Sequence, residues 1–173
     1  MTEQEKRLHR CCFTGHRPIK LPWGEQEDDP RCQDLKARLR DAIETAYEEG
    51  YRHFICGMAR GVDFYCCELC FSLREKHPDV TVEAAIPYAA QADHWPPEEK
   101  IRYRNLVAGC NYETVVQEKY DAGCYARRNR YMVDHASLVI AVNDGQPGGT
   151  RQTILYAMAR QVPVVDLPVE IIK

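Results

Sequence analysis

A glycine-rich turn at residues 144–150 offers the most distinctive chemistry in the sequence. It reads Asp144-Gly-Gln-Pro-Gly-Gly-Thr150 and separates an apolar, β-branched run from a segment with helical periodicity. A strand, a glycine turn and a helix start leave free backbone N–H groups at the positive end of the helix dipole, which is a geometry that binds phosphate. Gly148 and Gly149 allow close approach of a ligand, and Thr150 can cap the helix or donate to a phosphate oxygen. An ordinary strand–helix connection explains the turn equally well, because a lone glycine turn is weak evidence.

Three further turns carry residues of a similar kind, and each follows a predicted strand. They are Thr14-Gly-His-Arg-Pro18, Gly57-Met-Ala-Arg-Gly-Val-Asp63, and Pro87-Tyr88 with the loop that follows. The carboxyl ends of parallel strands meet at one edge of a sheet, so we expect one ligand site there. Arginines suit phosphate, aromatic rings suit a base, and carboxylates suit ribose hydroxyls. The residues expected to bind the ligand are Thr14, Gly15, His16, Arg17, Gly57, Arg60, Gly61, Asp63, Pro87, Tyr88, Trp95, Arg128, Asn129, Asp144, Gly145, Gly148, Gly149 and Thr150.

Strands and helices alternate along the chain and must position these turns. Apolar, β-branched runs predict strands at 10–14, 51–56, 80–86, 112–116, 138–143 and 161–167, with Pro87-Tyr88 ending the third. Periodicity and breakers predict helices from Cys32 to Gly50, then at 63–76, 98–108, 124–135 and 150–160. This alternation predicts an α/β protein with a doubly wound, mostly parallel sheet and helices on both faces. We expect a single domain over residues 1–173, with residues 1–9 as a loose polar arm.

Composition restricts the classes of function. The 173 residues carry a net charge of −3, which makes nucleic acid an unlikely partner. We expect a cytoplasmic protein without membrane association, because the sequence shows neither an apolar run of the roughly 20 residues that a membrane span needs nor a signal peptide. The nine cysteines include Cys66, Cys67 and Cys70 on one predicted helix. We expect these thiols to pack in the core, with no metal site, because further ligands at suitable spacing are missing.

The turns together resemble the SLOG superfamily, the Rossmann-like group that contains the DNA-processing protein DprA and the cytokinin-activating LOG enzymes. The similarity is greatest to the YpsA-like family of uncharacterised bacterial proteins. It spans nearly the whole chain and implies a nucleotide-derived ligand at the glycine turns, without an established reaction. The motifs that carry it are Gly15-His-Arg-Pro18, Gly57-Met-Ala-Arg-Gly-Val-Asp63, Arg128-Asn129 with Met132-Val-Asp134, and Asp144-Gly-Gln-Pro-Gly-Gly-Thr150.

The resemblance leaves three functions open. The first is a domain that binds or senses a nucleotide-like molecule, such as a nucleotide or an ADP-ribose- or NAD-like ligand, with no required cofactor and possible self-association. The second is LOG-like hydrolysis of an N-glycosidic bond, for which the family motif PGGxGTxxE is shortened here and has Thr153 at the position of its Glu. A carboxylate must then come from Asp63, Asp134 or Asp144. The third is DprA-like binding of single-stranded DNA, for which Arg127, Arg128 and Arg130 are a basic patch.

Overall fold

The computed structural model describes residues 1–169 and contains one sheet of six strands. The strands are β1 (Arg10–Thr14), β2 (His53–Cys56), β3 (Thr81–Tyr88), β4 (Tyr112–Gln117), β5 (Leu138–Asn143) and β6 (Val164–Pro168). Every pairing is parallel, and the strand order is β4-β3-β2-β1-β5-β6. The predicted α/β, Rossmann-like class is therefore confirmed. The last four residues of the expected domain, 170–173, lie outside the described residues.

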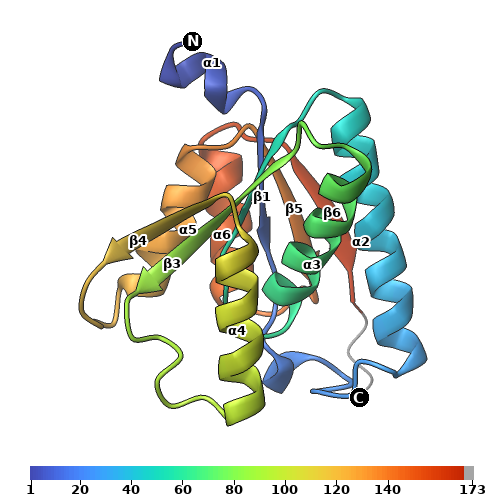
Figure 1. The fold of residues 1–173 in the computed structure, drawn as a ribbon, viewed down its shortest axis with the longest axis vertical. Coiled ribbons are helices and arrows are strands. Elements are labelled where there is room, and N and C mark those ends of the chain that lie inside the picture. Colours follow the sequence, from blue (N-terminus) through green and yellow to red (C-terminus); the bar gives the residue numbers. More distant parts are fainter. Residues whose placement is uncertain (170–173) are drawn as a thin grey trace.

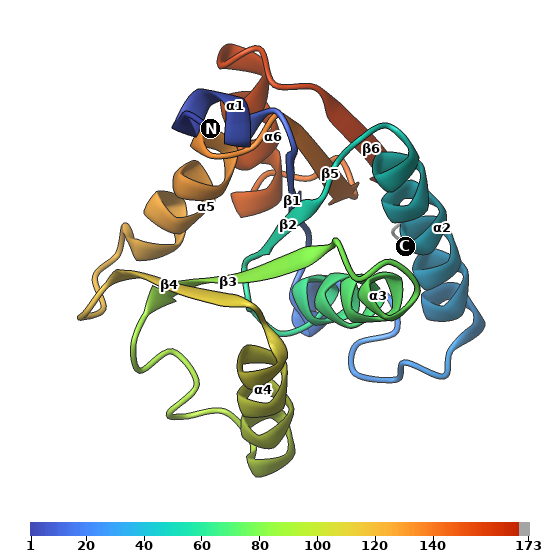
Figure 2. The same cartoon turned by 45° about the horizontal axis from the view of Figure 1, so that its top comes forward.

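Helices cover both faces of the sheet (Figures 1 and 2). One face carries α2 (Pro30–Glu48) and α3 (Val62–Lys76), with α4 (Pro97–Gly109) packed against α3. The other face carries α5 (Cys124–Asp134) and α6 (Gly149–Ala159). This arrangement buries a core on each face, and each of the helices α2 to α6 runs back from the carboxyl ends of the strands toward their amino ends (Figure 1).

Local sequence signals explain where the helices begin and which faces they bury. Helix α2 begins after Asp29, whose carboxylate accepts from the backbone N–H of Arg31, and Pro30 occupies its first position. Its buried residues Leu35, Leu39 and Ile43 recur every four positions, the spacing of one helix face. On α3, Cys66, Cys67 and Cys70 are fully buried, as expected for core residues.

Two expectations about the elements were wrong. Residues 1–9 are not a loose arm, because Glu3–Arg7 forms the short helix α1 with a capping box between Thr2 and Glu5. The third strand does not stop at Ile86, because β3 includes Pro87 and ends only at Tyr88. The missing N–H of Pro87 is tolerated there because β2 pairs with β3 only as far as Ala84, so that side of β3 has no neighbouring strand.

The strand order reverses between β1 and β5. Strand β1 lies between β2 and β5, and the chain adds strands outward from β1 first on one side and then on the other. The loops that leave β1 and β5 lead to helices on opposite faces of the sheet (Figure 1). In open α/β sheets, ligands bind in the crevice that such a reversal creates. Within residues 1–169, every helix falls short of the length or the hydrophobicity needed to cross a lipid bilayer.

Candidate functional site

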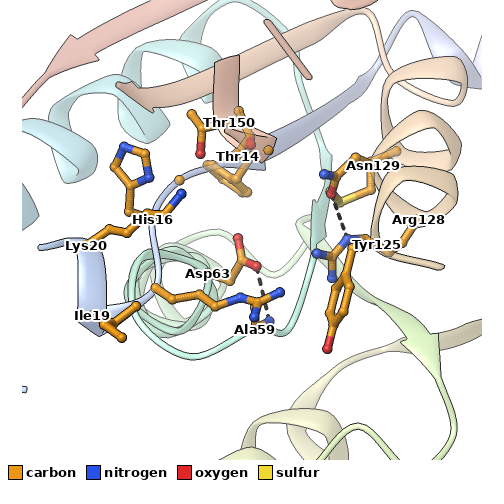
Figure 3. Close-up of a pocket in the computed structure, with 15 residues that line it drawn as sticks. Thr14, His16, Ile19, Lys20, Ala59, Asp63, Tyr125, Arg128, Asn129 and Thr150 are labelled. Carbon is orange, nitrogen blue, oxygen red and sulfur yellow. Dashed lines mark hydrogen bonds between the residues drawn. The ribbon is translucent and has the colours of Figure 1, made fainter. Parts of the chain in front are cut away.

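A cavity of about 330 Å³ lies at the carboxyl edge of the sheet, where β1 and β5 diverge (Figure 3). Figure 3 shows labelled side chains from the β1 loop, from α3 and α5 and from the start of α6 around one space. The lining residues are Phe13, Thr14, Gly15, His16, Arg17, Ile19, Lys20, Ala59, Asp63, Tyr125, Arg128, Asn129, Met132, Gly149 and Thr150. The structure thus brings together nine of the expected site residues: Thr14, Gly15, His16, Arg17, Asp63, Arg128, Asn129, Gly149 and Thr150. We call this space the phosphate cavity.

The amino end of α6 forms one wall of the phosphate cavity. Gly148 precedes the helix at a φ of 149° without a side-chain cap, so the first backbone N–H groups of α6 have no capping side chain. A Cβ added at Gly149 would meet no atom within 4 Å, which leaves this backbone open to a ligand. Thr150 lies one residue further and is buried. The helix dipole and the free N–H groups together favour an anion here.

The glycines of the other two turns have a different role. A Cβ at Gly15 would lie 2.4 Å from Val62 Cγ1, and a Cβ at Gly61 would lie 2.6 Å from the carbonyl oxygen of His16. Gly61 also has a φ of 89°, which favours glycine. These residues let the β1 loop and the β2–α3 turn pack in direct backbone contact, where the Val62 N–H donates to the His16 carbonyl at 3.2 Å. Gly57 instead leaves room for two side chains of the site, because a Cβ there would lie 2.9 Å from Asp63 Oδ2 and 3.1 Å from the Arg128 guanidinium.

Arg128 and Asp63 place opposite charges in the inner wall. Arg128 is buried and donates from Nε to Asn129 Oδ1 at 2.8 Å and from its guanidinium to the Gly57 carbonyl. Burial lowers its pKa, yet an arginine remains charged in such a site. Asp63 accepts from the Ala59 N–H at 3.1 Å, and burial raises its pKa, while Arg128, that N–H group and Arg17 oppose the rise.

His16 has a buried ring nitrogen without a hydrogen-bond partner. Its side chain is almost fully buried, and Nε2 lies 3.1 Å from Asp144 Oδ1. The two atoms are within ion-pair range, but their direction does not suit a hydrogen bond, so Nε2 lacks a hydrogen-bond partner. Asp144 Oδ1 instead accepts from the Gln146 N–H at 2.9 Å. An unpaired buried polar atom costs about 1–3 kcal/mol, which a ligand that pairs with it would recover.

A second cavity, of about 240 Å³, adjoins the first. It is lined by Arg17, Pro18, Ile19, Ala59, Arg60, Gln91, Trp95 and Tyr125, four of which also line the phosphate cavity. Two more expected site residues, Arg60 and Trp95, therefore lie here. The Arg60 guanidinium pairs with carboxylates of Glu25 and Glu99, so it is not a free cation for phosphate. We call this space the aromatic cavity.

The remaining expected residues lie outside both cavities. Asp134 is at the far end of α5, where it accepts from the Tyr156 hydroxyl at 2.7 Å and lies 3.6 Å from Arg160. Tyr88 packs edge-on against Tyr125 and thus acts at most through that ring. The residues that line neither cavity are Gly57, Gly61, Pro87, Tyr88, Asp134, Asp144, Gly145 and Gly148.

Several lining residues were missed in the sequence. Tyr125 precedes Arg128 and Asn129 by three and four positions on α5, a spacing that puts all three on neighbouring parts of the helix surface. This spacing could have identified Tyr125. Ile19 and Lys20 lie in the 3-10 turn η1 (Pro18–Lys20), which bends the loop back over the cavity. Only the path of that loop puts them there.

The predicted basic patch on α5 does not form one surface. Arg128 is buried, whereas Arg127 bonds Asp121 and Gln117 on the exposed side. Arg130 lies with its guanidinium 5.9 Å from the centre of the Tyr156 ring. The three cations therefore face different partners.

Two Bacillus subtilis proteins are similar to this chain over most of its length. One is the uncharacterized SPbeta prophage-derived protein YoqJ, which is 30% identical over 143 residues that cover 75% of this chain and 83% of that protein. The other is YpsA, which is 22% identical over 145 residues that cover 83% of this chain and 80% of that protein.

Two solved structures of DprA share the fold. The Streptococcus pneumoniae protein aligns with a TM-score of 0.64 at 14% identity. The alignment covers 96% of this chain and 52%, or about half, of that protein. The Helicobacter pylori protein aligns with a TM-score of 0.62 at 16% identity, over 98% of this chain and 69% of that one.

The sequence as a whole also matches a known family. The YpsA model, described as the YspA SLOG family, matches residues 11–173, which include every lining residue of both cavities. The chain belongs to the YspA SLOG family of the SLOG superfamily.

Proposed function

We propose that this protein binds a nucleotide-derived, phosphate-bearing small molecule at the carboxyl edge of its sheet. The observation that carries the proposal is the phosphate cavity, into which the open backbone at Gly149 and the uncapped start of α6 face. Arg17, Lys20 and Arg128 line the same space and add positive charge. Free N–H groups at a helix start together with arginines are the usual receptors of phosphate.

The polar lining also suits the sugar of a nucleotide. Asp63, Asn129 and Thr14 line the phosphate cavity beside the cations, and their oxygens can accept from ribose hydroxyls. The orphaned His16 Nε2 adds a buried group that a ligand oxygen or hydroxyl can satisfy. A phosphorylated nucleoside meets these requirements, and the protein then acts as a binding or sensing domain that needs no further cofactor.

Hydrolysis of an N-glycosidic bond is the second candidate, and Asp63 favours it. This buried carboxyl lies in the phosphate cavity, and burial raises its pKa, which is the direction that favours a general acid. Thr153, at the position of the LOG glutamate, donates its hydroxyl to the Gly149 carbonyl at 2.8 Å and offers no carboxylate. Asp63 is therefore the residue on which hydrolysis would depend.

Single-stranded DNA, which the Helicobacter pylori DprA protein binds, is less well supported here. The net charge of −3 and the divided arginines of α5 leave no continuous basic face at that helix. DNA binding would appear as a salt-sensitive mobility shift with oligonucleotides.

A thermal-shift screen against nucleoside mono- and diphosphates, ADP-ribose and NAD tests the proposal. A ligand at 100 times its dissociation constant should stabilise the protein by about 2.7 kcal/mol. Chromatography of the same mixtures after incubation separates binding from hydrolysis, because hydrolysis releases free base and Asp63→Asn would stop it. An absence of any shift across the panel, with calorimetry in agreement, would overturn the proposed ligand class.

A further inference from the structure

Two orphaned polar atoms mark the carboxyl edge of the sheet. Among residues 1–169, the buried side-chain nitrogen and oxygen atoms without a hydrogen-bond partner are His16 Nε2 and Gln91 Oε1. His16 lines the phosphate cavity and Gln91 lines the adjoining aromatic cavity. Buried polar groups are normally paired, so a pair of exceptions in adjacent cavities points to a ligand that contacts both.

The amide of Gln91 is held in one orientation. Its side chain is buried, and Nε2 donates to the Met58 carbonyl at 3.1 Å. The amide nitrogen must face Met58, because an oxygen there would oppose another acceptor. The free atom is therefore an acceptor, and it requires a donor from the ligand. Met58 itself is fully buried at a φ of 62°, an uncommon conformation that this hydrogen bond helps to hold.

Aromatic rings give the aromatic cavity flat walls. Trp95 is fixed by edge-on contacts with Phe64 and Tyr103, whose ring centres lie 6.0 and 5.3 Å away. Tyr125 also lines this cavity, with the Arg17 guanidinium 4.5 Å from its ring centre. Such walls suit a planar heterocycle, which can stack on an aromatic face.

Charge separates the roles of the two cavities. Arg17, Lys20 and Arg128 line the phosphate cavity, where Asp63 is the single lining carboxylate. In the aromatic cavity the guanidinium of Arg60 is already paired with two carboxylates. A phosphate is therefore favoured in the first cavity and an uncharged ring in the second, and the shared residue Arg17 lies between them.

We infer that the aromatic cavity is a subsite for the base of the nucleotide, in which Gln91 Oε1 accepts a hydrogen bond from the exocyclic amine of an amino-bearing base. This inference rests on the function proposed above. An exocyclic amine projects beyond its ring and can reach a lone acceptor. The ring N–H of hypoxanthine adjoins one carbonyl oxygen, and that of uracil lies between two. Such an oxygen would oppose Gln91 Oε1, because the Gln91 amide group already donates to the Met58 carbonyl and also bonds the Tyr103 hydroxyl. The ligand class is thus adenine or cytosine nucleotides rather than their oxo counterparts.

Isothermal titration of the full chain with two matched pairs tests the inference. AMP and IMP, and likewise CMP and UMP, differ by an amine in place of a carbonyl. At least one amino member should bind about tenfold or more tightly than its oxo partner, because the oxo base leaves a buried acceptor unpaired. Ribose 5-phosphate, which has no base, should bind more weakly and report on the phosphate cavity alone.

Variants then assign the preference to Gln91. In Gln91→Leu the preference between amino and oxo bases should disappear while the affinity for ribose 5-phosphate stays within about twofold. Gln33→Leu is the matched control, because the amide of Gln33 also donates to a backbone carbonyl, that of Glu27, on the exposed surface. If Gln91→Leu fails to fold, the ratios of AMP to IMP affinity and of CMP to UMP affinity in the wild type still test whether the site prefers an amino base.

The outcomes distinguish the two proposals. Equal affinities within both pairs, or an equal loss of ribose 5-phosphate and AMP binding in a folded Gln91→Leu variant, would overturn the base subsite and leave phosphate binding intact. Failure of ribose 5-phosphate and of all four nucleotides to bind the wild type would overturn the proposed function itself.

Discussion

The two edges of the sheet carry cavities that differ in how their polar groups are satisfied. At the amino edge, beneath α1, lies a space of about 770 Å³, larger than the phosphate cavity of about 330 Å³. Its central residue Glu83 meets His53 Nε2 at 2.7 Å and accepts from Thr114 and Tyr131, while His53 Nδ1 meets Thr81 Oγ1 at 2.6 Å. The polar groups of this network therefore satisfy one another without a ligand.

At the carboxyl edge, by contrast, two buried polar atoms lack hydrogen-bond partners. His16 Nε2 and Gln91 Oε1 are the two such atoms within the described part of the chain, and both lie there. The start of α6 adds backbone N–H groups without a capping side chain. The smaller cavity, at the carboxyl edge, is therefore the better candidate for a ligand site. Its unsatisfied polar groups gain more free energy from a ligand than do the polar groups of the larger cavity, which already pair with one another.

The largest expected effect comes from filling the carboxyl edge at Gly149. Gly149→Val should weaken binding of ribose 5-phosphate or AMP by about 100-fold, roughly 2.8 kcal/mol, because the new side chain enters open space at the start of α6. The free energy of unfolding should change by less than about 1 kcal/mol, since the added Cβ meets no atom within 4 Å. Calorimetry and urea unfolding measure the two quantities. Ala159→Val, at the exposed end of the same helix, is the control.

Disrupting the Glu83 network at the amino edge should lower the stability of the protein and leave its ligand affinity unchanged, the opposite of the effect at Gly149. Glu83→Ala leaves the hydroxyls of Tyr131 and Thr114 without their acceptor, which should lower the free energy of unfolding by about 1–3 kcal/mol. Ligand affinity per folded molecule should not change. Glu113→Ala, on the neighbouring strand but exposed, should have little effect on stability. A loss of ligand binding in folded Glu83→Ala would show that the two edges are coupled and would contradict this comparison.

A charge at the rim of the phosphate cavity should matter less than its backbone. Arg17→Ala should weaken ribose 5-phosphate binding by about tenfold, roughly 1.4 kcal/mol, and should reduce the sensitivity of binding to salt. Arg127→Ala removes an equal charge that is paired with Asp121 outside the cavity, and we expect it to bind normally. Similar losses in both variants would mean that general charge, rather than the cavity, attracts the ligand.

The smallest expected effect is the loss of stability at acidic pH when Glu83 becomes protonated. Burial alone would raise the pKa of Glu83, but hydrogen bonds from His53, Tyr131 and Thr114 outweigh it and hold this pKa below its usual 4.5. The stabilisation is therefore present above the unfolded pKa and is lost as the pH falls through the lower, folded pKa. The difference in melting temperature between the wild type and Glu83→Gln should narrow from about pH 6 to about pH 3. A constant difference would show that the charge of Glu83 is not what stabilises the network.

The sequence by itself determined the elements and the edge on which the turns gather. Apolar runs and glycine breaks located the six strands. The signal is strongest for β1, β2 and β5, because a parallel strand buried on both faces is apolar along its length. Parallel strands end at one edge, so Thr14, Arg17 and Thr150 could be expected together before their contacts were known. The helix α1 was also readable from its capping box at Thr2 and Glu5, although it was missed.

Only the tertiary structure decided which glycine is open and which charge is free. Gly15 and Gly149 look alike in the sequence, yet one packs against Val62 and the other faces a cavity. Arg60 lies within a glycine turn and Arg128 in the first turns of a helix. Arg60 is paired with Glu25 and Glu99, carboxylates from a distant loop and helix, whereas Arg128 lines the phosphate cavity. The reason is physical: a turn motif sets local backbone geometry, whereas its partners come from segments whose approach depends on strand order and packing across the whole sheet.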